Sequence, residues 1–454
     1  MSFTRWRQGG REAAVIGLGK SGVAAGLLLR REGIAVYASD RAGEADKAVG
    51  AEGVGRLVHG GAEVQLGGHD LARIARAGVC VVSPGVPPGA PPLKAARDAG
   101  VPIVSELDVG YAALPGTKFA VITGTNGKTT TTALTGHLLQ AGGLGAIAAG
   151  NIGRPLAQVA IDGERPEWVV LEISSFQLHD THDLVPTIGA MTNLAPDHLD
   201  RYATLEEYYA DKDRLYLNAT ATSCWVTNGD DAEVERRAAG RPGERLRFRI
   251  GREAEAWYAK DERALMLQGD RLLPREELGL LGDHNVANAL CASLIAWRAG
   301  APFEGIRSGL RSFRALPHRM EPVRSVGNVL WINDSKATNV ASTLVAVQAL
   351  DRPFILLLGG RHKGEPYTAL AAAATGRCRA VIAYGESREL VAGDLDPLLP
   401  VTRAGNDFEA VLAEARRLAR PGDAVLLSPA CSSYDMFQNY EDRGAQFRAA
   451  VEAM

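Results

Sequence analysis

The chain has little of what marks a secreted, disulfide-bonded or membrane protein. Its five cysteines lie far apart and form no CxxC pair: Cys80, Cys224, Cys291, Cys378 and Cys431. This spacing excludes a disulfide framework and a cysteine zinc site, and it indicates reduced thiols in a cytosolic protein. Nowhere are there about 18 uninterrupted apolar residues, the length that a bilayer-spanning helix needs. We expect no membrane insertion, and no signal peptide, since Lys20 interrupts the first apolar run.

An excess of charge of one sign is also missing. The chain has 50 Lys and Arg against 53 Asp and Glu, a net charge of −3. Such a balance argues against a nucleic-acid partner or an acidic lipid surface. At 454 residues the chain is too long for a single hydrophobic core, and its length predicts about three domains.

One stretch combines a strand, a glycine-rich turn and a helix in the order that creates an anion site. It is FAVITGTNGKTTTTALTGHLLQ, residues 119–140, in which strand formers end at the turn 124–129 and a leucine-lined helical pattern follows. A helix that begins in such a turn points several backbone N–H groups and its positive end at one position. The stretch therefore predicts a phosphate-binding loop.

Two side chains at the start of this helix suit a nucleotide triphosphate. Lys128 would pair with the outer phosphates, and the hydroxyl of Thr129 would reach a bound Mg²⁺. The loop is a short variant, GxxGK[ST], because Ile122 occupies the position of the first glycine in the standard motif. The alternative is a glycine turn that happens to precede Lys-Thr, and we favour the triphosphate site.

The N-terminal segment has the pattern of a dinucleotide fold. A strand at 13–16 leads into the turn GLGKSG, and a second strand at 34–38 ends at Asp40. A GxGxxG turn with an acidic residue about 20 positions later indicates an α/β nucleotide-type fold. Bound NAD is less favoured, because nothing later in the chain suggests hydride chemistry. A further strand at 79–82 ends in SPGVPP, residues 83–88, which is either a binding loop or a plain proline-rich turn.

Candidate metal ligands follow strands of the middle segment. An apolar strand at 168–171 ends in Glu172, and a carboxylate there, beside a P-loop, suits Mg²⁺, although it would equally cap the next helix. A strand at 187–192 ends in NLAPDHLDRY, which contains His198. Lys212 lies between two aspartates on a predicted helix, where a solvated helix face is the default interpretation.

The rest of the middle segment is less informative. Asn285 and Asn288 stand one turn apart at the start of a predicted helix that ends at Gly300, where amides can address a purine edge or the backbone. The stretch 228–274 is rich in Arg and Glu, and we expect a small β-hairpin layer there.

The C-terminal segment alternates apolar strands with polar loops and helices. The strands are predicted at 329–332, 354–358, 380–384 and 424–427. This alternation predicts a parallel α/β sheet whose polar groups lie at the carboxyl edge, where such sheets bind ligands.

Motifs along nearly the whole chain resemble those of the Mur ligases, the amino-acid-adding enzymes of peptidoglycan synthesis. The motifs are VIGLGKSG, GTNGKTT, GNIG, LEISSFQL, NLAPDHLDRY, LGDHNVANA, LPHRME, WINDSKATN and SPACSSYDMFQNYEDRG. The motifs WINDSKATN and SPACSSYDMF resemble those of the family member that adds D-glutamate. The resemblance implies an α/β fold of three domains: a UDP-substrate-binding Rossmann-like domain at 1–107, a central ATP-binding P-loop domain with a mostly parallel sheet at 108–315, and a C-terminal amino-acid-binding Rossmann-like domain at 316–454.

The resemblance also implies a reaction and its partners. The chain would be an ATP-dependent amide ligase that adds D-glutamate to UDP-N-acetylmuramoyl-L-alanine through an acyl phosphate. It would act in peptidoglycan precursor synthesis, and so in cell wall biogenesis, cell shape and cell division. ATP and two Mg²⁺ ions are expected, with Lys212 carbamylated as an anionic metal ligand. The enzyme would be a cytoplasmic monomer that binds neither nucleic acid nor membrane.

By the same resemblance, each domain supplies part of the site. Residues implied in UDP-substrate binding are Lys20, Ser21, Asp40, Arg41, Ser83, Asn151 and Gln177. Residues implied in ATP binding are Gly124, Thr125, Asn126, Gly127, Lys128, Thr129, Thr130, Asn285, Asn288, Arg319 and Asp334. Metal ligands would be Thr129, Glu172, His198 and Lys212, with Lys128, His198 and Lys212 catalytic and His198 the candidate general base. Residues implied in D-glutamate binding are Lys336, Thr338, Lys363, Ser433 and Tyr440. The family often has GKST where this chain has GKTT, and Phe where Tyr440 stands.

Two other functions fit parts of the sequence. An oxidoreductase built on the first segment would leave the P-loop at Lys128 unexplained. A nucleotide-binding regulatory or scaffold protein without catalysis would not need Lys128, Glu172, His198 and Lys212 together.

Overall fold

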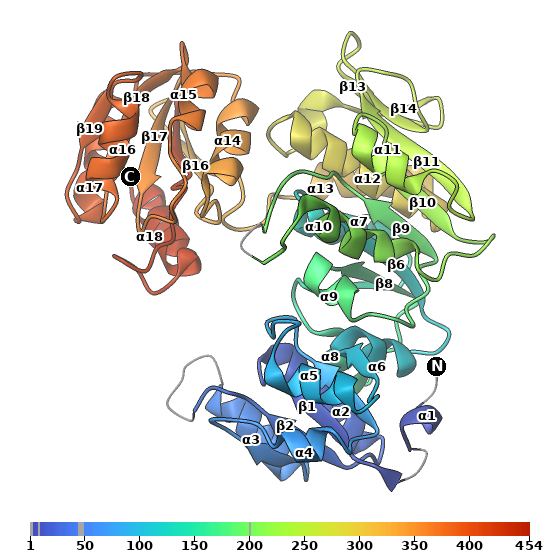
Figure 1. Cartoon of the computed structure of the whole chain (residues 1–454). Helices are drawn as coiled ribbons and strands as arrows, with labels where there is room; N and C mark the ends of the chain where they lie inside the picture. The colour runs from blue at the N-terminus through green and yellow to red at the C-terminus, as the bar shows by residue number, and fades with distance from the viewer. Residues whose placement is uncertain (1–2, 8–9, 44–49, 199–200) are drawn as a thin grey trace. The chain divides into compact units, whose positions relative to one another are not determined.

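The computed structural model contains three sheets, each covered by helices, and it describes residues 3–7, 10–43, 50–198 and 201–454 (Figure 1). Two compact units result. One consists of Met1–Glu277 with Ala287–Arg311 and contains two of the sheets, and the other consists of Leu278–Val286 with Ser312–Met454 and contains the third. The three-domain α/β fold class expected from the sequence is confirmed, while the exact domain boundaries stay predictions.

The first sheet is wholly parallel, with the strand order β3-β2-β1-β4-β5. Its strands are β1 (Ala13–Ile16), β2 (Val36–Ser39), β3 (Glu63–Gln65), β4 (Val79–Val82) and β5 (Ile103–Ser105). Its helices are α1 (Thr4–Arg7), α2 (Lys20–Arg31), α3 (Ala51–His59), α4 (Leu71–Ile74), α5 (Pro91–Asp98) and α6 (Glu106–Ala112). The strand order reverses between β1 and β4, which is where doubly wound sheets bind ligands. The turns GLGKSG and SPGVPP follow these two strands.

The second sheet has the order β14-β13-β12-β11-β10-β9-β6-β8-β7. Its strands are β6 (Lys118–Thr123), β7 (Ala146–Gly150), β8 (Trp168–Glu172), β9 (Ile188–Met191), β10 (Cys224–Asn228), β11 (Glu244–Ile250), β12 (Ala256–Ala259), β13 (Ala264–Leu267) and β14 (Asp270–Pro274). The helices of this region are α7 (Lys128–Ala141), α8 (Leu156–Ile161), α9 (Ser175–His179), α10 (Leu205–Asp213), α11 (Ala232–Ala238), α12 (Asp283–Arg298) and α13 (Phe303–Ser312).

The stretch 228–274, where a small β-hairpin layer was expected, extends this second sheet. Strand β11 pairs parallel with β10 and with β12, and only β13 and β14 run antiparallel to their neighbours. The prediction of hairpins is confirmed for β12, β13 and β14, whereas β11 forms no hairpin, because it pairs parallel with both neighbours. The strands of this stretch extend the sheet from β10, which itself pairs with β9, so their place depends on segments that are distant in sequence.

The third sheet has the order β15-β16-β20-β17-β18-β19. Its strands are β15 (Glu321–Val326), β16 (Val329–Asn333), β17 (Phe354–Gly359), β18 (Cys378–Tyr384), β19 (Val401–Arg403) and β20 (Ala424–Leu427). Its helices are α14 (Val340–Ala349), α15 (Ala369–Ala374), α16 (Arg388–Leu395), α17 (Phe408–Leu418) and α18 (Tyr440–Glu452). The parallel pairing of the four predicted strands is confirmed, and β15, which was not predicted, adds an antiparallel edge strand beside β16.

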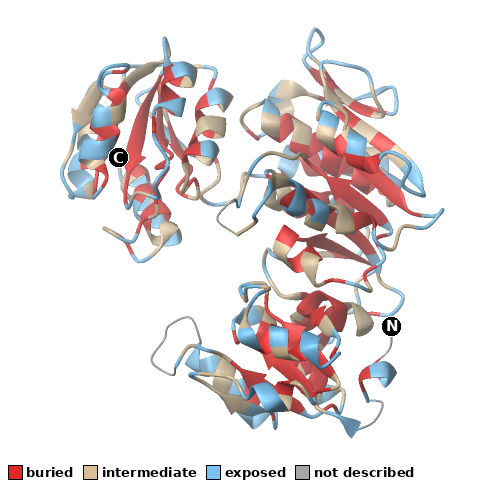
Figure 2. Cartoon of the chain, viewed as in Figure 1, coloured by how far each residue is buried: buried red, intermediate tan, exposed pale blue. Residues whose placement is uncertain are grey.

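The central strands are buried from end to end. All four residues of β1, β4 and β20 are buried, as Figure 2 shows in red. Parallel strands covered by helices on both faces have such continuous apolar runs, which explains why the sequence located these three strands correctly. Strands β3, β5 and β19 were not predicted, since each has only three residues and β3 and β19 are partly exposed.

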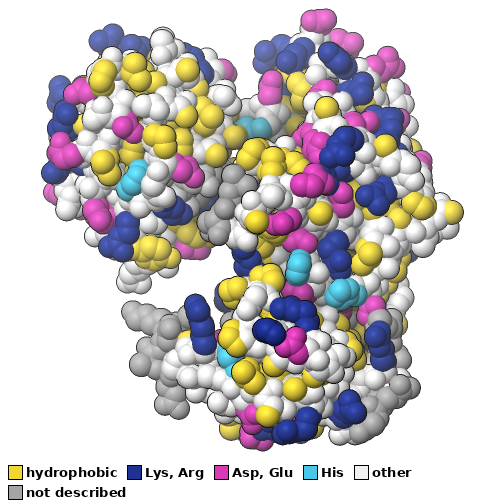
Figure 3. Space-filling model, in the orientation of Figure 1, with side chains coloured by type: hydrophobic (Ala, Val, Ile, Leu, Met, Phe, Trp, Pro, Cys, Tyr) yellow, Lys and Arg dark blue, Asp and Glu magenta, His cyan; other side chains and the backbone are white. Residues whose placement is uncertain are grey.

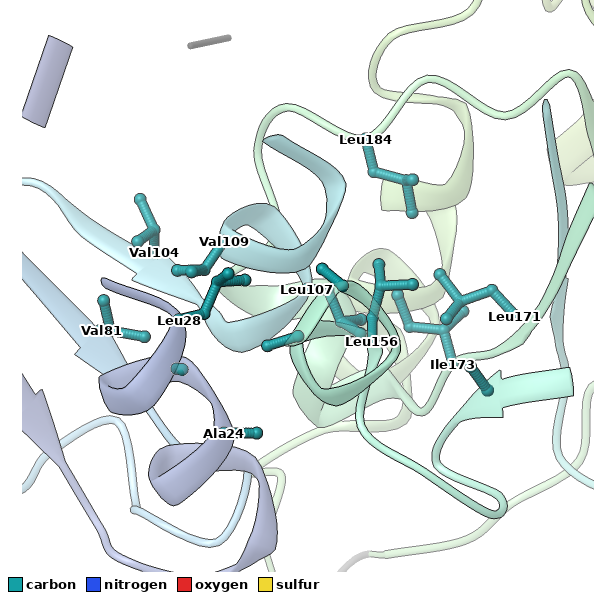
Figure 4. Close-up of a cluster of buried hydrophobic side chains, with 14 of the residues drawn as sticks. Ala24, Leu28, Val81, Val104, Leu107, Val109, Leu156, Leu171, Ile173 and Leu184 are labelled. Atoms are coloured by element: carbon teal, nitrogen blue, oxygen red, sulfur yellow. The ribbon is translucent and has the colours of Figure 1, made fainter. Parts of the chain in front are cut away.

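A continuous core joins the first two sheets. Leu28 of α2, Leu107 of α6 and Leu156 of α8 lie between side chains of the first sheet, such as Val81, and of the second, such as Leu171 (Figure 4). The α6–α8 contact is close, because a Cβ on Gly110 would lie 2.7 Å from the backbone nitrogen of Ala157. The two sheets are therefore held together by packing and not by a bare linker.

Charges of both signs occur on the face of the molecule that Figure 3 shows. Lys and Arg side chains are interspersed with Asp and Glu over the face seen in Figure 3. Within the ranges that the structure describes, no helix is both long enough and apolar enough to cross a bilayer.

Candidate active site

The GTNGKTT turn lies between β6 and α7, in the middle of the second sheet. Gly124 and Gly127 adopt positive φ angles of 140° and 81°. A Cβ on Gly124 would lie 2.0 Å from the hydroxyl of Thr192, and one on Gly127 would lie 2.3 Å from the side-chain oxygen of Asn288. Both positions therefore require glycine, because of the conformation and because of the close approach of these neighbours.

Lys128 folds back over the turn that precedes it. Its ammonium donates to the carbonyls of Gly124, at 2.9 Å, and Thr125, at 2.7 Å. These bonds fix the lysine at the start of α7, where a helix attracts anions. The lysine therefore lies where the outer phosphates of a nucleotide would be held.

The loop after β9 holds the other side of the turn. The backbone N–H of Asn126 donates to the side-chain oxygen of Asn193 at 2.8 Å, and the hydroxyl of Thr192 donates to the Asn126 carbonyl at 2.6 Å. The backbone N–H of Thr125 donates to the Asn193 carbonyl at 2.9 Å. The turn is thus preorganised by its neighbouring strand without any ligand.

Glu172 ends β8, the strand next to β6, and its carboxylate is only half satisfied. Its Oε1 accepts from the side-chain amide of Asn151 at 2.8 Å, whereas Oε2 is buried and has no hydrogen-bond partner among the residues that the structure describes. The whole residue is 2% exposed. A buried carboxylate oxygen without a partner is costly unless a cation binds there, so this atom suits a metal ligand.

Tyr208 connects three of the predicted site elements. Its hydroxyl lies 3.2 Å from that of Thr125 in the P-loop, and its ring lies 4.7 Å from the ammonium of Lys212 and 6.1 Å from the ring of His198. Sequence reasoning missed this residue. The signal that would have found it is the spacing of four between Tyr208 and Lys212, which puts both on one face of α10.

Lys212 does not lie on a solvated helix face. Its side chain is 1% exposed and donates to the carbonyl of Gly124 at 2.7 Å, the same carbonyl that Lys128 contacts. Burial, and secondly the charge of Lys128, lower the pKa of Lys212 well below its ordinary value. The structure thus places this lysine beneath the P-loop, where burial and a neighbouring like charge both disfavour its charged form.

His198 lies on the exposed side of this cluster. It has a positive φ of 54°, its ring contacts that of Phe176 at 4.8 Å, and its Nε2 lies 3.6 Å from the carboxylate of Asp197. Asp200, from the same sequence motif, lies outside the described residues. No group of three or more His, Cys, Asp or Glu side chains poised for a metal occurs within the part of the chain that the structure describes. A metal would therefore depend on other oxygens as well.

In the first sheet, the GLGKSG turn is fixed from two sides. The carboxylate of Asp40 accepts from the backbone N–H groups of Leu18, at 2.7 Å, and Ala42, at 2.9 Å. The hydroxyl of Ser83 donates to the carbonyl of Gly17 at 2.8 Å. Both residues thus support the turn, beside which Lys20 and Arg41 are exposed and Ser21 is half-buried. The roles of all five in binding the UDP part stay predictions.

Three predicted ligand contacts on α9 and α12 also have structural bonds. Gln177 accepts from the backbone N–H and the hydroxyl of Ser174, in a capping box at the start of α9. On α12, the buried Asn288 accepts from the hydroxyl of Thr131 at 3.2 Å, and Asn285 donates to the carbonyl of Leu281 at 2.8 Å. Their ligand roles stay predictions.

In the third sheet, the predicted residues follow the adjacent strands β16, β20 and β17. Lys363 donates to the hydroxyl of Thr338 at 3.2 Å. Lys336 donates to the hydroxyl of Tyr440, and its ammonium lies 3.9 Å from the centre of that ring. Ser433 is buried in the loop after β20. Two ammonium groups with hydroxyl partners suit a ligand that has carboxylates.

Asp334 is buried at the carboxyl end of β16, beneath these residues of the third sheet. Its carboxylate accepts from the hydroxyl of Ser428 at 2.8 Å and from the backbone N–H of Met320 at 3.0 Å. Burial raises the pKa of Asp334 to about 7, and the charge of Arg319 counteracts part of that rise. Asp334 thus holds the segment around Arg319 against the end of β16.

The architecture and the P-loop site define an ATP-binding α/β protein of three domains, and comparison with known proteins narrows this class. Residues 11–105 match the family described as Mur ligase MurD-like, N-terminal domain. Residues 122–296 match the Mur ligase middle domain, and residues 318–431 match the Mur ligase, glutamate ligase domain. The chain belongs to the Mur ligase family.

Curated relatives match over nearly their full length. Proteins of Acidobacterium capsulatum and Salinibacter ruber are each 40% identical, over 98% and 97% of this chain and over 96% and 98% of their own. A protein of Myxococcus xanthus is 40% identical over 98% of this chain and 99% of its own. All three have the name UDP-N-acetylmuramoylalanine–D-glutamate ligase.

Solved structures agree on the fold. UDP-N-acetylmuramate-alanine ligase MurC of Thermotoga maritima is 19% identical, with a TM-score of 0.61 over 98% of this chain and 99% of its own. MurF of Acinetobacter baumannii is 16% identical, with a TM-score of 0.61 over 92% and 91%. At these identities the likeness concerns the fold alone.

Proposed function

We propose that this chain is an ATP-dependent amide ligase that adds D-glutamate to UDP-N-acetylmuramoyl-L-alanine in peptidoglycan precursor synthesis. The observation that supports this most strongly is the 40% identity, over nearly the whole chain, to relatives named for that reaction. A preorganised P-loop with Lys128 and Lys212 on one carbonyl supports the use of ATP. An oxidoreductase or an inactive scaffold would leave this arrangement without a purpose.

In this proposal ATP binds at the P-loop. The backbone of Gly124 to Gly127 would hold the phosphates, with Thr129 and Thr130 at the helix start. On binding, Lys128 would exchange its two carbonyl partners for phosphate oxygens, which are stronger acceptors. Asn285 and Asn288 would address the adenine, and Arg319 and Asp334 would act on the nucleotide from the third sheet.

The residues present fit Mg²⁺. Glu172 offers a buried carboxylate oxygen without a partner, and Thr129 and His198 follow the adjacent strands β6 and β9. Mg²⁺ prefers oxygen ligands and is often held by one or two carboxylates together with substrate phosphates. When bound it would neutralise charge on the transferring phosphoryl group. We infer two ions and a carbamate on Lys212, supported by the burial and the lowered pKa of that lysine.

Replacing Glu172 with glutamine is expected to lower turnover by roughly 100-fold and to raise the Mg²⁺ concentration needed for half-maximal rate. The amide keeps the size of the side chain but removes the negative charge from the buried oxygen. Turnover would be measured against Mg²⁺ concentration at saturating ATP. Asp162→Asn, at an exposed ion pair with Arg154, is the matched control. An unchanged Mg²⁺ dependence in the glutamine variant would exclude Glu172 as a ligand.

The chemistry follows from the poor reactivity of a carboxylate towards an amine. Transfer of the γ-phosphoryl group to the muramoyl-alanine carboxylate forms an acyl phosphate, from which phosphate can leave. Lys128 would stabilise the charge on the transferring group. The neutral amine of D-glutamate then attacks the carbonyl carbon, phosphate leaves, and the amine proton passes to a base, for which His198 is the candidate. The products are the amide, ADP and phosphate.

D-Glutamate would bind at the carboxyl edge of the third sheet. Lys336 and Lys363 provide two positive charges for a dianionic amino acid, and Thr338, Ser433 and Tyr440 provide hydroxyl groups. Burial raises the pKa of Tyr440 to about 12, so its hydroxyl stays protonated and can donate to a carboxylate. In the first sheet, the UDP part would be bound by Lys20, Ser21, Asp40, Arg41 and Ser83.

The deciding experiment is a coupled assay for ADP. We expect ADP formation only with UDP-N-acetylmuramoyl-L-alanine and D-glutamate together, and at least 100-fold slower formation with L-glutamate or D-alanine. ADP formation with another amino acid, and none with D-glutamate, would contradict the proposal.

The proposal also comprises a cytoplasmic monomer that binds neither nucleic acid nor membrane. The five free cysteines support the cytoplasm, and the balanced charge supports the absence of nucleic-acid and membrane partners.

A further inference from the structure

Two loops at the carboxyl edges of different sheets are joined by one side chain. Residues 83–88 follow β4 of the first sheet, and the loop containing Arg201 follows β9 of the second. The guanidinium of Arg201 donates from Nη1 to the carbonyl of Pro84 at 3.1 Å and from Nη2 to the carbonyl of Val86 at 3.2 Å. Both loops belong to the same compact unit.

Within the second sheet's loop, Arg201 contacts His198, the candidate metal ligand, both through the Phe176 ring and through the backbone. Its guanidinium carbon lies 3.8 Å from the centre of the Phe176 ring, and the same ring contacts that of His198. The backbone N–H of Arg201 donates to the carbonyl of His198 at 3.0 Å. A displacement of the arginine would therefore displace the histidine with it.

On the other side, residues 83–88 pack directly against the GLGKSG turn. A Cβ on Gly17 would lie 2.8 Å from a methyl group of Val86 and 2.9 Å from the Cβ of Ser83. Ser83 also donates to the Gly17 carbonyl. The contacts thus form a continuous series from the turn, through Val86 and Arg201, to Phe176 and His198.

We propose that Arg201 is a positioning residue that sets the spacing between the GLGKSG turn and the loop that contains His198. This rests on the proposed function, in which the UDP part of the substrate binds at the first turn and its carboxylate must reach the P-loop. The substrate then bridges two fixed points, and an error of about 1 Å in their spacing costs on the order of 100-fold in rate. The flat fork of arginine presents its N–H donors to the two carbonyls in one fixed plane, whereas the shorter ammonium of a lysine is a point charge on a flexible stem and would not fix their spacing.

The test compares Arg201→Ala and Arg201→Lys with the parent enzyme. We expect the alanine variant to lose about 100-fold in kcat and the lysine variant to lose nearly as much. The dissociation constants of UDP alone and of Mg²⁺ with a non-hydrolysable ATP analogue, measured by calorimetry, should change less than 3-fold, because each binding region remains intact. Hydrogen exchange in residues 83–88 should increase in both variants.

Arg241→Ala is the matched control. Arg241 belongs to the same unit and also combines a backbone carbonyl, that of Arg237, with an aromatic ring, that of Tyr216. Its loss should leave kcat within 2-fold of the parent.

Three results would overturn the positioning role. These are a kcat within 2-fold of the parent in Arg201→Ala, full activity in Arg201→Lys, and a loss of UDP affinity equal to the loss of rate, which would indicate direct contact with the nucleotide. If alanine prevents folding, the lysine variant decides. Failure of the proposed function would appear separately, as an inactive parent enzyme.

Discussion

Replacing Lys128 with alanine is expected to lower ADP formation by roughly three orders of magnitude while the protein stays folded. The Lys128 ammonium contacts the turn that would hold the phosphates, through the carbonyls of Gly124 and Thr125. It interacts more strongly with the transferring phosphoryl group than with the ground state, so its loss should appear mainly in kcat. Removing two hydrogen bonds between a half-buried ammonium and backbone carbonyls should cost little stability, about 1 kcal/mol.

The control uses the second Gly-Lys hydroxyl turn of the chain. Lys20 follows Gly19 at the start of α2 in the first sheet, as Lys128 follows Gly127 at the start of α7. Lys20→Ala should raise the KM for the UDP substrate and leave the KM for ATP unchanged. Steady-state rates with each substrate varied would be measured, with thermal unfolding to check the fold. If Lys20→Ala weakened ATP and Lys128→Ala did not, the two nucleotide sites would have been interchanged.

These two turns show which features of the fold can be predicted from neighbouring residues in the sequence. Strand, glycine turn and helix are each set by residues within about 20 positions, so both turns and the strands before them were predicted correctly. The capping box formed by Ser174 and Gln177 is similarly local, as a Ser-x-x-Gln signature. Such features do not depend on how the sheets assemble.

The parts that could not be predicted depend on segments distant in sequence. Tyr208 and Arg201 act through contacts with Thr125, Pro84 and Val86, which are between 83 and 117 positions away. The burial of Lys212 also depends on a distant segment. A lysine between two aspartates is typical of a solvated helix face, and only the packing of α10 beneath the P-loop buries it. Residue patterns identify which groups can react, and tertiary packing decides which of them are held against one another.

Lys212→Arg is expected to lower turnover by roughly 100-fold or more, although it preserves the positive charge. An ammonium that is 1% exposed and shares a carbonyl with Lys128 is unfavourable, because burial and like charge both disfavour the cation. The neutral amine can add to the carbon of CO₂ with loss of a proton, which forms a carbamate. That anion would relieve the repulsion by Lys128 and supply oxygens to a metal. A guanidinium can neither lose its charge nor form this product.

The same argument predicts that the parent enzyme depends on dissolved CO₂. Prolonged removal of CO₂ and bicarbonate at neutral pH should lower the rate several-fold, and added bicarbonate should restore it. With ¹³C-labelled bicarbonate, a carbamate carbon resonance should appear in the parent and be absent in Lys212→Arg. Lys118, an exposed lysine that pairs with Glu167 at the start of β6, is the control, since its replacement by arginine should leave both rate and resonance unchanged. A parent enzyme with no labelled resonance and a CO₂-independent rate would mean that Lys212 acts as a free amine, and that the second metal must take its oxygens from the substrates.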